Sequence, residues 1–182
     1  MEVLEAIKTR RSIRKYKTTP VDDKTIGLVL EAARWAPSWA NTQCWRFIVV
    51  RDTNIKSELA DVLGANNQAA GALIEAPVVI VACAELGKSG YFNGESVTEK
   101  GDWYMFDVAL AMQNLVLAAH SLGLGTVHIG KFDAKLVADI LQVPEGFCVV
   151  EMTPLGYPET KPEVKPRQEL SEIVFYDKFG IR

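Results

Sequence analysis

The sequence predicts a mixed α/β domain in which a central sheet is covered by helices on both faces. Three observations support this prediction. A continuous run rich in β-branched residues at 77–84 is typical of a strand that is buried on both faces. The segment at 102–122 is apolar nearly all round, which predicts a long buried helix. Shorter helical and strand patterns alternate along the rest of the chain.

The composition indicates one folded domain, 1–182, and excludes several classes of protein. A chain of 182 residues is too short for two domains of ordinary size, and a hydrophobic content of 48% is ordinary for a protein with a buried core. The net charge of −3 argues against a general nucleic-acid binder, which would carry a basic domain. No uncharged apolar run reaches about 18 residues, so no membrane partner is expected.

The cysteines give no sign of a metal site. Cys44, Cys83 and Cys148 are scattered, and none has the CxxC spacing of metal ligands. Cys83 lies in an apolar run, where a buried free thiol is the usual state. The first residues lack the basic segment and apolar stretch of a signal peptide. We therefore expect a protein of the reducing cytoplasm with no bound metal.

The elements of the first half follow from local patterns. Residues 2–9 predict a short helix whose basic end leads into an arginine cluster. The segment Pro20-Val21-Asp22-Asp23 has the acidic first turn of a helix, and Pro37 ends that helix. The pattern then predicts a strand at 45–51, helices at 54–64 and 67–75, and the buried strand at 77–84.

The second half begins with an irregular segment. Residues 86–101 are rich in glycine and poor in aliphatic residues, which indicates a mobile loop over a site. After the helix at 102–122 the pattern predicts a strand at 124–129, a helix at 133–141 and a strand at 147–155. Residues 156–182 carry several prolines and many charges, which predicts an extended arm of a kind that wraps a partner.

An arginine cluster near the start is the first candidate for a binding site. Arg10, Arg11, Ser12 and Arg14 place three guanidinium groups and a hydroxyl within five residues. The guanidinium group presents a rigid fork of donors that matches phosphate oxygens. The alternative is a solvated basic end of the short helix, where positive charge is favourable in itself.

A second candidate lies in the loop after Pro37. Asn41 and Gln43 stand beside two indoles, Trp39 and Trp45. Indole surfaces and neutral amides together suit a flat aromatic ring with polar edges. With the phosphate site, this composition favours a nucleotide or flavin mononucleotide as the ligand. The alternative is that the amides satisfy their own loop backbone.

Together with three further stretches, these two resemble the nitroreductase family of FMN-dependent NAD(P)H oxidoreductases over nearly the whole chain. The further stretches are Gly123–Asp133, Lys165-Pro166-Arg167 and Tyr176–Gly180. The resemblance implies an α+β sandwich with a central mixed, mainly antiparallel sheet flanked by helices. It also implies an intertwined homodimer with FMN at the interface, in which residues 156–182 form an arm exchanged with the partner subunit.

The same resemblance implies the cofactor-binding residues. Those assigned to the phosphate and ribityl end of FMN are Arg10, Arg11, Ser12, Arg14, Lys165 and Arg167. Those assigned to the flavin ring are Pro37, Ser38 and Asn41 from the other subunit, Asn67, and backbone groups of His128, Ile129, Gly130 and Lys131. The spacing to the following strand leaves the amide contact open between Asn66, Asn67 and Gln68.

The function implied by the resemblance is hydride transfer from NADH or NADPH, through FMN, to a small acceptor such as a nitroaromatic or a quinone. One pocket would serve both substrates in turn, without a catalytic side chain. The alternatives are specialised flavin chemistry (reductive dehalogenation or flavin fragmentation) and a non-enzymatic FMN binder. His120 and His128 are expected to be packed residues and Phe106 a core residue, whereas Tyr91 or Phe92 could close over a flat substrate.

Overall fold

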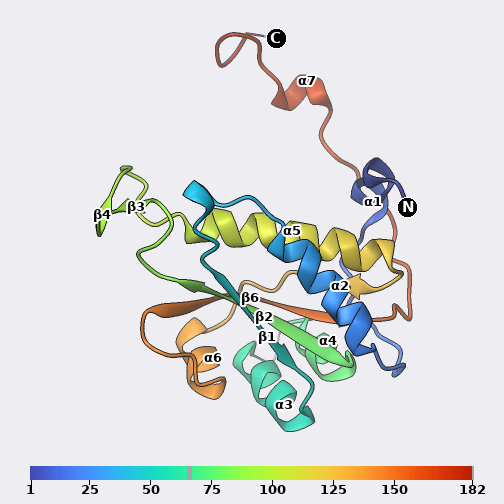
Figure 1. Ribbon diagram of the computed structural model, residues 1–182. Helices are drawn as coiled ribbons and strands as arrows, with labels where there is room; N and C mark the ends of the chain where they lie inside the picture. Colours follow the sequence, from blue (N-terminus) through green and yellow to red (C-terminus); the bar gives the residue numbers. More distant parts are fainter. Residues whose placement is uncertain (65–66, 182) are drawn as a thin grey trace.

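The computed structural model describes residues 1–64 and 67–181 and has a four-stranded sheet at its centre (Figure 1). The strands are β1 (Trp45–Val50), β2 (Val78–Glu85), β5 (Gly125–Thr126) and β6 (Phe147–Gly156), in the spatial order β1-β2-β6-β5. All three strand pairs are antiparallel, and Ser12 adds a parallel bridge to Thr126 at the β5 edge. The predicted α+β sandwich with a mixed, mainly antiparallel sheet is confirmed.

Helices cover both faces of this sheet (Figure 1). One face carries α2 (Asp23–Arg34) and α5 (Tyr104–Ser121), and the other carries α3 (Thr53–Val62), α4 (Ala70–Glu75) and α6 (Ala134–Ile140). Strand β2 shows why: Ile80 and Ala82 belong to the core cluster with α2 and α5, whereas Val79 and Val81 belong to the opposite one. All four side chains have no exposed surface, as predicted for a strand covered on both faces.

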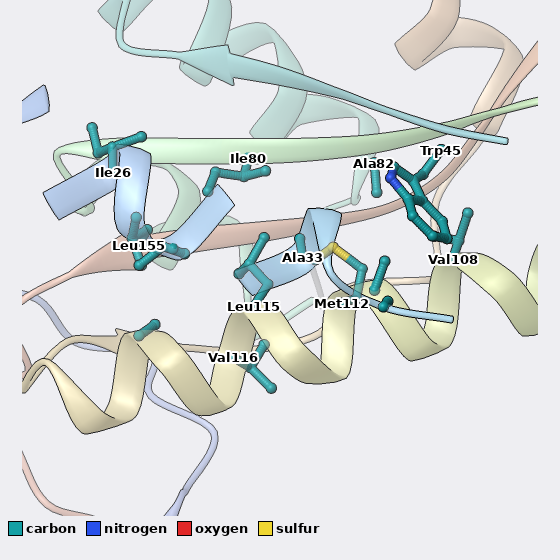
Figure 2. Close-up of a cluster of buried hydrophobic side chains, with 14 of the residues drawn as sticks. Ile26, Ala33, Trp45, Ile80, Ala82, Val108, Met112, Leu115, Val116 and Leu155 are labelled. Carbon is teal, nitrogen blue, oxygen red and sulfur yellow. The ribbon is translucent and has the colours of Figure 1, made fainter. Parts of the chain in front are cut away.

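The core between the sheet and α5 is built from side chains distant in the sequence (Figure 2). Met112 and Leu115 of α5 are fully buried and belong to one cluster with Ala33 of α2 and with Ile80 and Leu155 of the sheet. Burying a side chain of this size contributes about 1.5–3 kcal/mol to folding. The central sheet and α5 therefore form the packed core of the molecule, and the loops extend from it.

Aspartate residues cap the N-terminal ends of three helices. Asp22, Asp52 and Asp133 precede α2, α3 and α6, and each carboxylate accepts hydrogen bonds from backbone N–H groups in the first helical turn. Such caps stabilise a helix by about 1 kcal/mol because they satisfy donors that have no partner inside the helix. The helix predicted to start at Pro20–Asp23 is confirmed, and it begins at Asp23.

Helix α5 leaves part of its apolar surface uncovered in the single chain. Its apolar pattern predicts burial on all sides, with a partner subunit as one cover, and within the single chain Met105 is 56% and Phe106 is 55% exposed. The Phe106 ring instead meets Trp103 edge to face, with the ring centroids 5.4 Å apart. The prediction that Phe106 is a core residue is therefore wrong for this chain. An apolar pattern shows that a face avoids water, but not whether the same chain or another one covers it.

The remaining elements are short. Helix α1 is Val3–Thr9, the 3-10 turn η1 is Trp39–Asn41, and α7 in the arm is Leu170–Ile173. The segment predicted to be irregular holds a small hairpin of β3 (Tyr91–Phe92) and β4 (Glu95–Ser96). The strand predicted at 124–129 is reduced to the two residues of β5, after which Ile129 makes an isolated bridge to Met152.

Beyond Gly156 the chain first pairs with residues 15–17, where Pro158 bridges to Tyr16 and Glu159 N donates to Lys15 O. It then passes α1 and ends away from the sheet (Figure 1). Among the described residues, no helix has both the length and the apolar character needed to cross a membrane.

Candidate functional site

Two cavities that share Arg14 form the candidate site. The larger one has a volume of about 540 Å³ and the smaller one about 160 Å³. The larger is lined by Arg14, Leu63, Gly64, Asn67, Gln68, Ala69, Val127, His128, Ile129, Gly130 and Lys131. The smaller is lined by Arg10, Arg11, Ser12, Arg14, Pro162, Glu163, Lys165 and Arg167. The structure thus brings together most of the residues that the sequence singled out.

The smaller cavity is a basic pocket made by the two ends of the sequence. Its inner wall is the segment at 10–14, which follows α1 and is held against β5, because Ile13 N donates to Thr126 O at 2.8 Å. Ile13 is buried, and side chains of extended backbone alternate in direction, so Ser12 and Arg14 face the opposite way from Ile13. Lys165 and Arg167 of the arm close the pocket, together with the single carboxylate Glu163.

Two guanidinium nitrogens in this pocket lack hydrogen-bond partners among the described residues. Arg10 Nη1 and Arg11 Nε are buried and have no hydrogen-bond partner among the described residues. Burial lowers the pKa of Arg10 below its ordinary value, and the charges of Arg11 and Arg167 lower it further. Buried donors without partners are costly, so this arrangement is suited to an anion that would accept from them.

The larger cavity is lined by amides and by backbone. Its volume falls within the range of about 300–1,000 Å³ that small-molecule sites occupy. Ile129 exchanges two backbone hydrogen bonds with Met152, of 2.9 and 3.0 Å, which fix the segment at 127–131 against β6. The backbone N–H groups of Gly130 and Lys131 have no partner in the described part of the chain. A Cβ atom at Gly130 would meet no atom of the described residues within 4 Å, which leaves room for a ligand to approach closely.

Asn67 takes part in local structure as well as in the cavity. Its side-chain oxygen accepts from Ala69 N at 2.9 Å, in the turn that leads into α4. No residue in the described part of the chain accepts from its amide nitrogen, which remains a donor at the cavity wall. Gln68 lines the same cavity, whereas Asn66 lies outside the described residues.

Pro37, Ser38 and Asn41 do not line either cavity of the described chain. Their loop lies next to the N-terminal end of α5, because Trp39 N donates to Asp107 at 3.0 Å. The arginine cluster lies next to the other end of that helix, where Thr9 hydrogen-bonds His120 at 2.8 Å. With a rise of about 1.5 Å per residue, these two points on α5 are roughly 20 Å apart. The expected contact of this loop with the ring, from the other subunit, stays a prediction.

The two histidines have separate surroundings. His128 Nδ1 lies 2.8 Å from Glu151 Oε1, which fixes the ring relative to β6. Burial lowers the pKa of His120 below its ordinary value, and the charges of Arg10 and Arg11 lower it further. The pKa of His120 therefore depends on the charge of the basic pocket, although His120 does not line that pocket.

Asp107 is a residue of this region that the sequence patterns did not single out. It lies in the first turn of α5, is fully buried, and accepts hydrogen bonds from the loop at 38–44 and from Ser89. The sequence did hold one signal for Asp107. It is a single carboxylate in a helix that is otherwise apolar nearly all round, and a buried acid needs several hydrogen-bond partners.

Several known proteins are similar to this chain in sequence and in structure. The model of the nitroreductase family matches residues 7–157. A protein of Methanothermobacter thermautotrophicus with the provisional name NADH dehydrogenase/NAD(P)H nitroreductase is 36% identical over 167 residues, covering 89% of this chain and 80% of that protein.

Two solved structures are similar over almost the whole chain. A nitroreductase family protein from Clostridium novyi NT has a TM-score of 0.79 at 33% identity, covering 100% of this chain and 96% of that one. The NADPH:FMN oxidoreductase of Vibrio harveyi, complexed with NAD+, has a TM-score of 0.81 at 29% identity, covering 97% of this chain and 77% of that one.

Proposed function

This chain belongs to the nitroreductase family, and from that membership we propose that it is an FMN-dependent oxidoreductase. It passes hydride from NADH or NADPH, through FMN, to a small acceptor such as a nitroaromatic or a quinone. The similar proteins named as NAD(P)H nitroreductase and NADPH:FMN oxidoreductase support the class of reaction.

One observation carries the proposal. A pocket in which Arg10 Nη1 and Arg11 Nε have no partner among the described residues adjoins a cavity lined by amides and by backbone N–H groups that are also unpaired there, and Arg14 belongs to both. FMN has the matching chemistry, with a phosphate at one end and a flat ring with polar edges at the other. The residues that would hold the phosphate are Arg10, Arg11, Ser12, Arg14, Lys165 and Arg167, and those that would line the ring include Asn67 and residues 128–131.

The protein contributes binding, orientation and electrostatics. When bound, FMN supplies the chemistry of accepting hydride and returning it to a second substrate. The N–H groups of Gly130 and Lys131 and the amide of Asn67 offer hydrogen bonds to the polar edge of the ring. Arg14, at the junction of the two cavities, adds a fixed positive charge that favours negative charge on the ligand.

A homodimer would complete this site. In a two-fold dimer whose α5 helices pack antiparallel, the N-terminal end of one α5 lies beside the C-terminal end of the other. This arrangement would bring Pro37, Ser38 and Asn41 of one subunit to the flavin of its partner. The exposed apolar side chains of α1 and of the start of α5 support such an interface, and they include Val3, Leu4, Ile7, Met105 and Phe106.

The arm at 156–182 would be exchanged with the partner subunit in this dimer. Its apolar side chains are largely exposed in the single chain, which is costly unless another surface covers them. They are Val164, Leu170, Ile173, Tyr176, Phe179 and Ile181.

The proposal is tested by anaerobic spectrophotometry of the protein saturated with FMN. Adding NADH and NADPH separately should bleach the flavin band with at least one of them, and a quinone or nitroaromatic should restore it. Bound FMN that neither donor bleaches would contradict the oxidoreductase and leave a flavin-binding protein. Failure to bind FMN would contradict the cofactor assignment itself.

A further inference from the structure

The carboxylate of Asp107 joins two segments that are separate in the sequence. Its Oδ1 accepts from Trp39 N at 3.0 Å, and its Oδ2 accepts from Ser89 Oγ at 2.6 Å. Thr42 Oγ1 at 3.4 Å and the Cys44 thiol at 3.7 Å are further donors to Oδ2. Asp107 has no exposed surface, and none of the ion pairs in the described part of the chain includes it. Its contacts are thus made with the loop at 38–44 and with the base of the hairpin.

The loop at 38–44 has an unusual backbone. Ala40, Asn41 and Gln43 have φ angles of 44°, 57° and 49°, in the left-handed region that residues other than glycine rarely adopt. Such conformations persist where surrounding contacts fix them, and they gather at functional sites. Within the loop, Ser38 Oγ accepts from Gln43 N at 3.0 Å, and Gln43 Nε2 donates to Asn41 Oδ1 at 3.2 Å. Asp107 supplies the hydrogen bonds that tie this loop to the rigid helix.

The base of the hairpin at 86–101 is fixed at the same place. Ser89 is fully buried, and its carbonyl accepts from Trp103 N at 2.9 Å, at the start of α5. Gly90 packs directly on the Trp103 ring, where a Cβ atom would lie 2.6 Å from Cδ1. A displacement of Ser89 would therefore shift the carboxylate of Asp107, and with it the hydrogen bond that Asp107 accepts from Trp39 N.

We propose that Asp107 is a positioning residue that fixes the loop at 38–44 and the hairpin base in one arrangement, so that Ser38 and Asn41 are presented to the flavin. This inference rests on the proposed function, because the flavin of the partner subunit is what the loop would meet. Burial and the nearby Asp107 raise the pKa of Cys44 to about 12, so its thiol stays a donor throughout the neutral range. Asp107 acts through the loop and does not itself touch the ligand.

Hydrogen exchange tests the geometric half of the proposal without any flavin chemistry. In Asp107→Ala, exchange of the Trp39 amide should rise by roughly tenfold or more, since a hydrogen bond to a charged group is lost. Exchange in β2 should stay at the wild-type rate. Unchanged exchange at Trp39 in a folded variant would overturn the inference.

Two further variants keep this test decisive. If Asp107→Ala does not fold, Asp107→Asn keeps the size of the side chain but presents one accepting oxygen in place of two, and it should raise exchange at 38–44 or at Ser89. Wild-type exchange in both segments would overturn the inference. The matched control is Asp102→Asn, because Asp102 accepts from Gly87 N and Tyr104 N and from no residue of the 38–44 loop. It should leave exchange at Trp39 unchanged.

A double-mutant cycle tests the functional half. The rate of anaerobic flavin reduction is measured for wild type, Asn41→Ala, Asp107→Ala and the double variant, each saturated with FMN. If Asp107 works by placing Asn41, the double variant is no slower than the slower single variant. If the double variant is slowed by the product of the two single fold-changes in rate, the two residues act independently and the inference is overturned. A wild-type flavin that neither NADH nor NADPH reduces would contradict the proposed function instead, and the exchange experiment would still decide the role of Asp107.

Discussion

At the scale of single residues, the basic pocket is the feature with the most direct consequences. Arg10 carries a buried nitrogen that has no partner among the described residues, and Arg167 reaches the same pocket from the arm. Glu163 is the single carboxylate among these positive charges, so a bound anion would offset much of the remaining repulsion. We therefore expect the electrostatics of these side chains to depend on FMN binding.

Replacing either arginine should weaken FMN binding. Arg10→Ala or Arg167→Ala removes a charged partner of the phosphate, which is worth about 1.5–3 kcal/mol. Titration of the apoprotein with FMN, followed by quenching of flavin fluorescence, measures the loss. Arg51→Ala is the matched control, because Arg51 is an exposed arginine that pairs with Asp23 far from the pocket. Wild-type affinity in both pocket variants would refute the phosphate assignment.

His120 should make stability depend on pH. Its pKa is lowered in the folded chain, so the unfolded chain takes up the proton first as the pH falls through about 6.5. The folded state should therefore lose stability below that pH, and His120→Gln should lose less. Urea unfolding at neutral and at mildly acidic pH measures the difference. Equal pH dependence of the two proteins would contradict this reading of His120.

Inorganic phosphate gives a second test at the same residue. A bound phosphate would offset the charges of Arg10 and Arg11, so the pKa of His120 should rise toward its ordinary value. A histidine titration by NMR, with and without phosphate, detects this shift. The same titration in Arg10→Ala should show a smaller effect of phosphate.

At the scale of elements, β5 and the segment at 10–14 are fitted closely together. A Cβ atom at Gly125 would lie 2.7 to 2.9 Å from three side-chain atoms of Ile13. Because Ile13 stands between Ser12 and Arg14, any change at Gly125 displaces the wall of the basic pocket.

Gly125→Ala should therefore affect both stability and binding. Overpacking of this kind costs about 1–3 kcal/mol of folding free energy, and FMN affinity should fall as well. Thermal unfolding and FMN titration measure the two effects. Gly27→Ala is the control, since no atom in the described part of the chain lies within 4 Å of a Cβ there. It should stabilise α2 by roughly 0.5–1 kcal/mol. A Gly125→Ala protein with wild-type stability would contradict the close packing.

The elements also show what a sequence can predict. The strand at 77–84 and the helix at 102–122 follow from long apolar patterns, and the structure has them within a few residues. Strands β3, β4 and β5 have two residues each, too few for a pattern to emerge. The site, too, could be predicted only in part. The sequence shows the residue types that suit a phosphate and a ring. The role of Asp107 depends on Trp39 and Ser89, which only the fold brings to it.

At the scale of the whole molecule, the exposed apolar surface of the arm is the main consequence of the fold. Phe179 is 92% exposed in the single chain, and α5 leaves Met105 and Phe106 uncovered. In the proposed dimer, the partner subunit would cover these side chains.

Weakening the proposed dimer should release flavin. Phe179→Ala should raise the dimer dissociation constant and lower FMN occupancy in parallel, because each site would use residues of both subunits. Sedimentation with detection at the flavin band measures both quantities. Leu136→Ala, at a half-exposed leucine of α6, is the control and should change neither. A monomer that retains all its flavin would contradict the shared site.

The basic pocket takes one wall from residues 10–14 and the other from residues 165–167, which imposes an order on biosynthesis. A growing chain leaves the ribosome from its N-terminus at about 5–20 residues per second, so the second wall emerges about 8–30 s after the first. In the proposed complex the phosphate cannot be gripped from both sides until Arg167 has emerged. Cofactor binding is then a late step of maturation. In the proposed complex, a molecule that holds FMN is one whose chain has been synthesised as far as the arm.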